Sequence, residues 1–149
     1  MVIGQILGAE QTVAWLGSRR EQVQTALQVT VRKLAMELAG YVKKDKLAGQ
    51  ALHVRSGRLR RSITFKVTSE GTVVSGLVGT NVVYARIHEF GGHTKPHIIL
   101  PKNARALHFN GRYHPGSNFP ERSFLRSALK DMTPEIRAEL ALSIRGALK

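Results

Sequence analysis

The sequence predicts a single α+β domain with a long N-terminal amphipathic helix, a small antiparallel sheet containing a β-hairpin, a long loop and a C-terminal helix. Three observations predict this fold. Apolar residues recur at helical spacing near both ends of the chain, apolar and polar residues alternate in its middle, and glycine, proline and asparagine concentrate after that alternation. The 149 residues fit one domain with its own core.

The first helix is expected from about residue 11 to residue 46. Its apolar residues follow steps of three and four: Val23, Leu27, Val31, Leu34, Leu38 and Tyr41. Such a stripe indicates one buried helix face, used for core packing or helix–helix contact. Gly17-Ser18 predicts a break in this helix, with Ser18 as an N-cap and Glu21 completing a capping box.

A β-hairpin is expected next, after a short basic loop or helical turn over residues 53–62. Ile63, Phe65 and Val67 alternate with polar residues, which is typical of a half-buried strand. Residues 69–71 form a turn, and residues 72–80 make the returning strand. In 82–90 the apolar positions are spaced more like a helix than a strand, and Gly91-Gly92 ends that segment.

Residues 91–120 are expected to form loops, apart from a short strand at 106–109 followed by the hairpin turn Asn110-Gly111. A helical stripe then begins at Phe124 and continues to Met132. Thr133 reads as an N-cap with Pro134 at a first helical position, so a second helical piece is expected to begin there and to run to Leu148.

Charge is the strongest feature of the composition. Lys and Arg number 23 against 10 Asp and Glu, which gives a formal net charge of +13. Between Lys46 and Pro120 there are 11 Lys and Arg against only Glu70 and Glu89. This excess favours an anionic partner, with DNA, RNA, an acidic protein surface and a membrane face all open. Aromatic residues make up only 6%, so stacking platforms for single strands are few.

Several classes of protein are disfavoured. The chain has no cysteine, which excludes disulfides, thiolate metal sites and cysteine nucleophiles. No apolar run is long enough to span a bilayer, and the N-terminus has no basic segment of the kind that opens a signal peptide, so we expect a cytoplasmic location in the producing cell.

Histidines suggest two sites that we regard as weaker hypotheses. His88, His93 and His97 would hold a metal only if a folded loop brought them together, because the spacing does not match a single helix face. His108-Phe109-Asn110 with His114 faintly resembles a histidine–asparagine–histidine nuclease, but it has no acidic ligand nearby. We expect no metal, no cofactor and no catalytic residue.

The basic patch, which we define as Arg55, Arg58, Arg60 and Arg61, is the favoured contact surface. So many guanidinium groups within seven residues cannot all find internal carboxylates. Arginine binds phosphate and carboxylate through paired hydrogen bonds, so the patch is expected to meet a nucleic-acid backbone or an acidic protein. A solvated surface without a partner is the alternative.

From these residues onward the sequence resembles the neck and tail-completion proteins of tailed bacteriophages, including the minor tail protein Z of lambda-like phages and the virion-morphogenesis proteins of Mu-like phages. The resemblance covers roughly residues 55–130 and rests on the order of several motifs. They are Arg55–Ile63, Val78–Asn81, Tyr84–Gly92, Pro101–Phe109, His114–Ser117 and Pro120–Leu129. Glu121 departs from the pattern, since many relatives have a small residue there.

This resemblance implies a structural subunit of the virion neck or tail, assembled in the host cytoplasm. It implies a homo-oligomeric ring, usually of six copies, that completes the tail and joins it to the head. The implied partners are the tail terminator or tail tube, the head connector and DNA passing through the ring, with no membrane. The domain would divide into a helical arm (1–46), the family-like core (55–130) and a C-terminal helix (131–149).

The 91–118 loop is the second expected contact surface. We expect Tyr84 to Phe90 to pack on the hairpin with Arg86 and Glu89 pointing outward, Gly57 to turn the chain with a positive φ, and Phe124 to dock the last helix. The expected interface residues are Arg86, Glu89, His93, Lys95, Lys102, Arg105 and Arg112. A free nucleic-acid-binding module is the competing function, and a metal-dependent nuclease is the weaker one.

Overall fold

The computed structural model describes residues 9–53, 56–99 and 112–148 and confirms the α+β prediction. The elements in chain order are α1 (Ala9–Tyr41), the π-helical segment η1 (Val42–Gln50), α2 (Arg58–Ser62), β1 (Thr64–Glu70), β2 (Val73–Gly79), α3 (Ala85–Phe90), β3 (Gly92–His93), β4 (His97–Ile99), β5 (Arg112–His114), β6 (Asn118–Phe119) and α4 (Leu125–Ala147).

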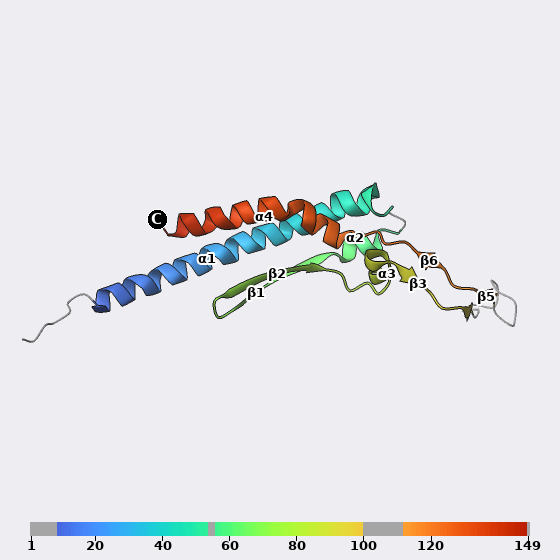
Figure 1. Cartoon of the computed structure of the whole chain (residues 1–149), viewed down its shortest axis with the longest axis horizontal. Coiled ribbons are helices and arrows are strands. Elements are labelled where there is room, and N and C mark those ends of the chain that lie inside the picture. Colours follow the sequence, from blue (N-terminus) through green and yellow to red (C-terminus); the bar gives the residue numbers. More distant parts are fainter. Residues whose placement is uncertain (1–8, 54–55, 100–111, 149) are drawn as a thin grey trace, which may run out of the picture.

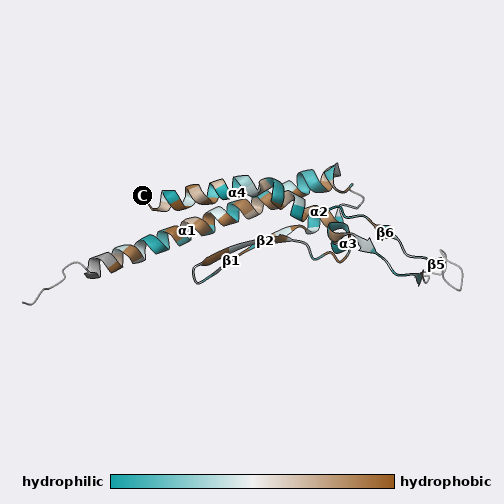
Figure 2. Cartoon of the chain, in the orientation of Figure 1, coloured by the Kyte–Doolittle hydropathy of each residue, from teal (hydrophilic) through white to brown (hydrophobic). Residues whose placement is uncertain are grey.

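Helix α1 lies between two layers, with α4 on one side and the β1–β2 hairpin on the other (Figure 1). Hydrophobic and hydrophilic residues alternate along both long helices (Figure 2). This pattern is typical of helices that bury part of their surface against a neighbouring element and expose the rest to solvent. The break expected at Gly17-Ser18 is wrong. Ser18 Oγ donates a hydrogen bond to the Trp15 carbonyl oxygen at 2.8 Å, so its hydroxyl bonds back along a continuous helix instead of capping a new one.

The expected hairpin is confirmed, and Gly57, at φ 68°, makes the turn that leads into it through α2. Cross-strand pairs such as Phe65–Val78 and Val67–Gly76 share the face turned toward α1. The hairpin is tied to α1 at its tip, where Gln24 Nε2 donates to the Gly71 carbonyl at 2.8 Å.

Gly76 allows the close approach of β2 to α1. A Cβ at this position would lie 3.0 Å from Val31 Cγ1 and 3.4 Å from the Ala35 Cβ. Replacing Gly76 by valine is therefore expected to lower the free energy of unfolding by about 2 kcal/mol, because overfilling a tight contact forces the layers apart. Urea unfolding measures the change, and Gly79→Val, where a Cβ meets nothing within 4 Å, is the matched control. Equal losses in the two variants would contradict this packing argument.

Helix α4 packs antiparallel on α1 through small polar contacts. Thr30 Oγ1 donates to Ser143 Oγ at 2.8 Å, and the Lys33 ammonium pairs with Glu139 at 3.1 Å. Lys46 pairs with Asp131 at 2.7 Å, and this hydrogen bond, followed by the one from Tyr41, lowers the pKa of the Asp131 carboxyl.

The second helix start expected at Thr133-Pro134 is also wrong, because α4 runs through Pro134 without a break. Thr133 Oγ1 donates to the Leu129 carbonyl at 2.7 Å, so it bonds back along the helix as Ser18 does. Proline in a helix interior costs about 3 kcal/mol, and the packing of α4 along α1 outweighs that loss.

The core lies where the layers meet beside α2 and α3. It is formed by Ala39, Val42, Leu47, Leu52, Ile63, Val82, Ala85, Phe124 and Ala128. Phe124 is fully buried, which confirms its expected role in docking α4. The expected orientation of α3 is wrong for Glu89: Ala85 and Glu89 are buried, while Phe90 is 59% exposed.

Residues 91–120, which we call the arm, form a two-stranded ribbon in their described part instead of the expected loops. β3 pairs antiparallel with β6, and β4 pairs antiparallel with β5. The ribbon projects past α3, away from the two long helices (Figure 1). The strand expected at 106–109 and its turn lie outside the described residues.

Candidate functional site

Three of the four arginines of the basic patch are placed by the short helix α2, and Arg55 lies outside the described residues. Arg58, Arg60 and Arg61 are all exposed. Within the described ranges none of these three guanidinium groups forms an ion pair with a carboxylate. The patch therefore presents uncompensated positive charge to solvent, as the sequence predicts.

Arg58 and Arg60 line a cleft of about 800 Å³, which we call the basic cleft, whereas Arg61 does not. The walls come from η1, α2, α3 and the base of the arm, and they bring Arg122, His53 and His88 to the same hollow. Its apolar lining consists of Leu47, Leu52, Leu59, Tyr84, Phe119 and Pro120. No aspartate or glutamate is among the lining residues. Sequence reasoning missed Arg122, because this residue reaches the cleft only when the second strand of the arm leads the chain back to the body.

His88 has an aromatic setting in this cleft. Its ring meets Tyr84 edge-to-face at 6.0 Å between centroids and Phe119 at 6.3 Å. These contacts connect α3 to the base of the arm.

Glu89 is not an outward interface residue, which corrects the prediction for it. Its side chain is 3% exposed and caps the first turn of α4. The carboxylate accepts hydrogen bonds from the backbone N–H groups of Phe124, Leu125 and Arg126, at 2.8, 2.9 and 2.9 Å. Ser123 Oγ donates a fourth, at 2.9 Å. One buried carboxylate thus satisfies amides that the start of a helix would otherwise leave without partners.

Burial by itself would raise the pKa of the Glu89 carboxyl. The three backbone hydrogen bonds and the Ser123 hydroxyl outweigh it, so the pKa lies below the ordinary value of 4.5. The group is therefore a charged structural anchor and is poorly suited to donate or accept protons near neutral pH.

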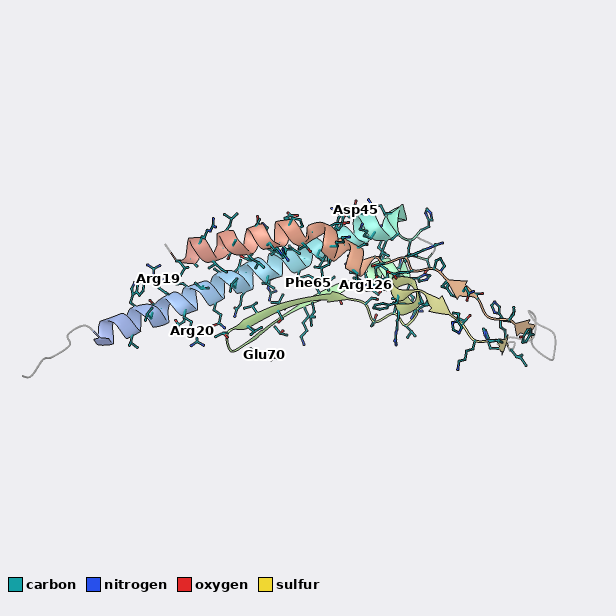
Figure 3. All side chains as sticks on the ribbon, in the orientation of Figure 1. Arg19, Arg20, Asp45, Phe65, Glu70 and Arg126 are labelled. Atoms are coloured by element: carbon teal, nitrogen blue, oxygen red, sulfur yellow. The ribbon has the colours of Figure 1, made fainter. Side chains whose placement is uncertain are left out.

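Arg126 completes this junction, and Figure 3 shows it at the first turn of α4, beside α3. Its Nε donates to Glu89 Oε1 at 3.2 Å, and its Nη2 donates both to the Glu89 carbonyl and to Glu121 Oε1 at 2.8 Å. The guanidinium also lies 4.6 Å from the centre of the Phe90 ring. Glu121, the residue that departs from the expected pattern, thereby gains a local partner.

The remaining expected interface residues fall on α3 and the arm. Arg86, His93 and Lys95 are exposed. Lys102 and Arg105 lie outside the described residues, and Arg112 belongs to β5. The sequence of the arm holds four Lys and Arg, four His and no acidic residue. Among the described side chains of the arm, Lys95 is exposed and adds positive charge to its surface.

The histidines proposed as metal ligands are not brought together. His88 lies on α3, His93 on β3, and His97 on β4, where its ring stacks on His114 at 5.1 Å. Across the part of the chain that the structure describes, no three His, Asp or Glu side chains gather in a way that could hold a metal ion. His108 lies outside that part.

The arrangement is suited to binding anions. It combines exposed arginines and an apolar hollow beside an arm whose sequence has no carboxylate, and the Glu89 junction connects α3 to the start of α4. Among the described residues no helix has both the length and the hydropathy needed to cross a bilayer.

A comparison with family models connects the chain to phage assembly. The model of the phage virion morphogenesis family matches residues 34–148, about three quarters of the chain, from the last two turns of α1 to the end of α4. Searches of the curated proteins and of the solved structures find no match. Because the family match spans the hairpin, the basic cleft, the arm and α4, this chain belongs to the phage virion morphogenesis family and has a role in phage structure or assembly.

Proposed function

We propose that the chain is a neck subunit that assembles as a ring, of six copies by analogy with the proteins it resembles, at the head-proximal end of the tail. There it completes the tail and joins it to the head, without catalytic activity. The proposed partners are further copies of itself, the tail terminator or tail tube and the head connector. Packaged DNA would pass through the ring.

The amount of exposed surface carries this proposal. The chain exposes 11807 Å², whereas a compact monomer of 16.5 kDa exposes about 7,600 Å². The described residues add to this surface through an elongated, layered body and a projecting arm (Figure 1). Stable interfaces in permanent assemblies bury surfaces of that order, so a subunit of this shape is suited to being surrounded by other subunits.

The exposed apolar side chains support the same proposal. Leu77 on the outer face of the hairpin is 62% exposed, Ile98 on the arm is 60% exposed and Val83 before α3 is 93% exposed. They occur in three separate parts of the chain: β2, β4 and the turn before α3. Apolar surface spread in this way favours contacts with more than one neighbour.

A phage lacking this gene product tests the proposal. Negative-stain imaging of the lysate is expected to show DNA-filled heads and tails that fail to join, and the wild-type gene supplied in trans should restore joined particles. Joined, infectious particles in the absence of the protein would overturn it.

A nucleic-acid-binding module remains the second candidate, favoured by the net charge of +13 and the carboxylate-free arm. It predicts duplex affinity that falls steeply between low and moderate salt, because binding releases condensed counterions. The neck proposal predicts weak duplex affinity and ring-sized or tail-bound protein. Titration of a labelled duplex at two salt concentrations, beside size-exclusion chromatography with light scattering, distinguishes them.

A further inference from the structure

The lining of the basic cleft combines two chemistries. Arg58, Arg60 and Arg122 supply guanidinium groups from two different segments, and no lining carboxylate neutralises them. The interior is closed by buried or half-buried apolar residues, among them Leu47 and Leu52, which are 3% and 9% exposed. A ligand that fills this cleft must therefore carry both negative charge and an apolar group.

A DNA duplex satisfies only half of this requirement. Its phosphates lie on the outside of a wide, stiff cylinder and bind to surfaces that follow the backbone. Such a cylinder can touch the arginines at the rim, but it has no apolar group to place against Leu52 or Phe119. A peptide with acidic and bulky apolar side chains supplies both and is thin enough to enter a cleft of about 800 Å³.

A second copy of this chain is a poor source of that peptide. Its 10 acidic residues are never closer than four positions apart, so no extended stretch presents neighbouring carboxylates. The closest set is Asp131, Glu135 and Glu139 on α4, where Asp131 pairs with Lys46 and Glu139 with Lys33. Glu89 is buried and Glu121 pairs with Arg126. The arm of a neighbouring copy would bring only positive charge to the positive rim.

We propose that the basic cleft binds an acidic segment of a different virion protein, with its carboxylates on Arg58, Arg60 and Arg122 and one bulky apolar side chain on the floor. This inference rests on the proposed neck function, which supplies the need for a second virion protein. It identifies that partner by chemistry: an exposed acidic stretch that contains an aromatic or aliphatic residue. Residues at the base of the arm line the cleft, so the bound segment would contact both the body and Phe119.

Direct binding to the full chain tests the chemistry. The probe is a short fluorescein-labelled peptide in which glutamates flank a phenylalanine and a leucine, measured by fluorescence anisotropy. Replacing its glutamates by glutamines is expected to weaken binding by about tenfold or more, since hydrogen bonds between charged groups are lost. This comparison uses the wild-type chain and so does not depend on the folding of any variant.

Two charge-matched double variants locate the site. R58E/R60E changes two arginines that line the cleft, and R32E/R137E changes two exposed arginines on α1 and α4, outside the cleft, by the same net charge. The first is expected to weaken acidic-peptide binding by about tenfold or more. The second should change it by less than about threefold, because exposed charges at a distance are screened. Circular dichroism melting confirms that both variants fold.

Three results would overturn the inference: equal losses in the two double variants, equal affinity for the glutamate and glutamine peptides, or displacement of the peptide by an equal concentration of a short DNA duplex. The last would identify the cleft as a nucleic-acid site. In complementation of a phage lacking the gene, R58E/R60E is expected to fail and R32E/R137E to restore joined particles. Normal joining with R58E/R60E would overturn the cleft assignment and leave the neck function standing. Joined particles without the gene would overturn the neck function, and the peptide measurements would still decide the cleft.

Discussion

Replacing Glu89 by glutamine is expected to lower the free energy of unfolding by about 3 kcal/mol, because it removes a buried charge on which an entire junction depends. The carboxylate accepts from three consecutive backbone amides at the start of α4, from Ser123 and from Arg126. A glutamine has one acceptor oxygen and brings an NH₂ group toward the same donors. Several of those donors would then lie buried without a partner.

Thermal unfolding followed by circular dichroism measures this effect. For a chain of this length, a loss of about 3 kcal/mol corresponds to a fall in Tm of about 10 °C. Glu121→Gln is the matched control, since Glu121 also bonds to Arg126 but its side chain is 55% exposed. Its removal is expected to change stability by less than about 1 kcal/mol. A similar fall in both variants would show that Arg126, and not the capped helix start, carries the stability.

The same carboxylate predicts how stability depends on acid. Because the pKa of Glu89 in the folded chain lies below its ordinary 4.5, its contribution is complete above that value. This contribution is lost as the pH falls from 4.5 through the lower pKa of the folded chain. In that range the carboxyl of the unfolded chain is protonated, and it must lose its proton before the junction can form. The difference in stability between wild type and Glu89→Gln should therefore shrink as the pH is lowered from 6 toward 3. A difference that stays constant over this range would mean that Glu89 does not act through its charge.

Glu89 also shows where sequence reasoning was wrong and why. The prediction for Tyr84 to Phe90 was a segment that packs on the hairpin with Glu89 pointing outward, yet Glu89 is buried and Phe90 is mainly exposed. The orientation of α3 is decided instead by the unsatisfied amides at the start of α4, 35 residues later in the chain. These amides need hydrogen-bond acceptors, which a carboxylate provides and an apolar side chain does not. Hydropathy carries no information about that need. An acidic residue within an apolar segment was the available signal.

The correctly predicted features share a local cause. The amphipathic stripe of α1, the alternation in the hairpin and the turn at Gly57 are each encoded within a few residues. The break expected at Thr133-Pro134 is absent because packing between α1 and α4 overrides capping propensity. At Ser18 the hydroxyl bonds back to the Trp15 carbonyl within a continuous helix, so it does not cap a new one. The exposure of Arg58, Arg60 and Arg61 followed from charge counting alone, whereas the basic cleft depends on the distant Arg122 and Phe119.

The arm could not be predicted as a ribbon, because its strands are two or three residues long and show no alternation. Pairing in the middle of the arm depends on two hydrogen bonds between Thr94 and Ser117. The Thr94 N–H donates to the Ser117 carbonyl at 3.0 Å, and the Ser117 N–H donates to Thr94 Oγ1 at 2.9 Å. Gly116, at φ 86°, makes this approach possible, since a Cβ there would lie only 2.1 Å from the Thr94 carbonyl oxygen.

Replacing Gly116 by valine is therefore expected to open the arm while the body stays folded, and to abolish head–tail joining. The described part of the arm contributes none of the buried residues that form the core, so the free energy of unfolding of the body should change by less than about 1 kcal/mol. Hydrogen exchange is expected to show loss of protection at the amides of the arm, including Thr94 and Ser117, and unchanged protection in the body. Complementation of a phage lacking the gene should then yield unjoined heads and tails.

Gly71→Ala is the matched control for this variant. Gly71 also has a positive φ, of 57°, in a hairpin turn, but a Cβ there meets nothing within 4 Å. It is expected to cost about 1 kcal/mol of backbone strain and to leave joining intact. If Gly116→Val opened the arm and particles still joined, the arm would not be a contact element, and the excess surface of the subunit would have to be buried through the hairpin and α1 instead. A side chain at position 116 fits only if the Thr94 carbonyl shifts. Unchanged protection at the Thr94 and Ser117 amides would therefore mean that the ribbon accommodates this shift without opening.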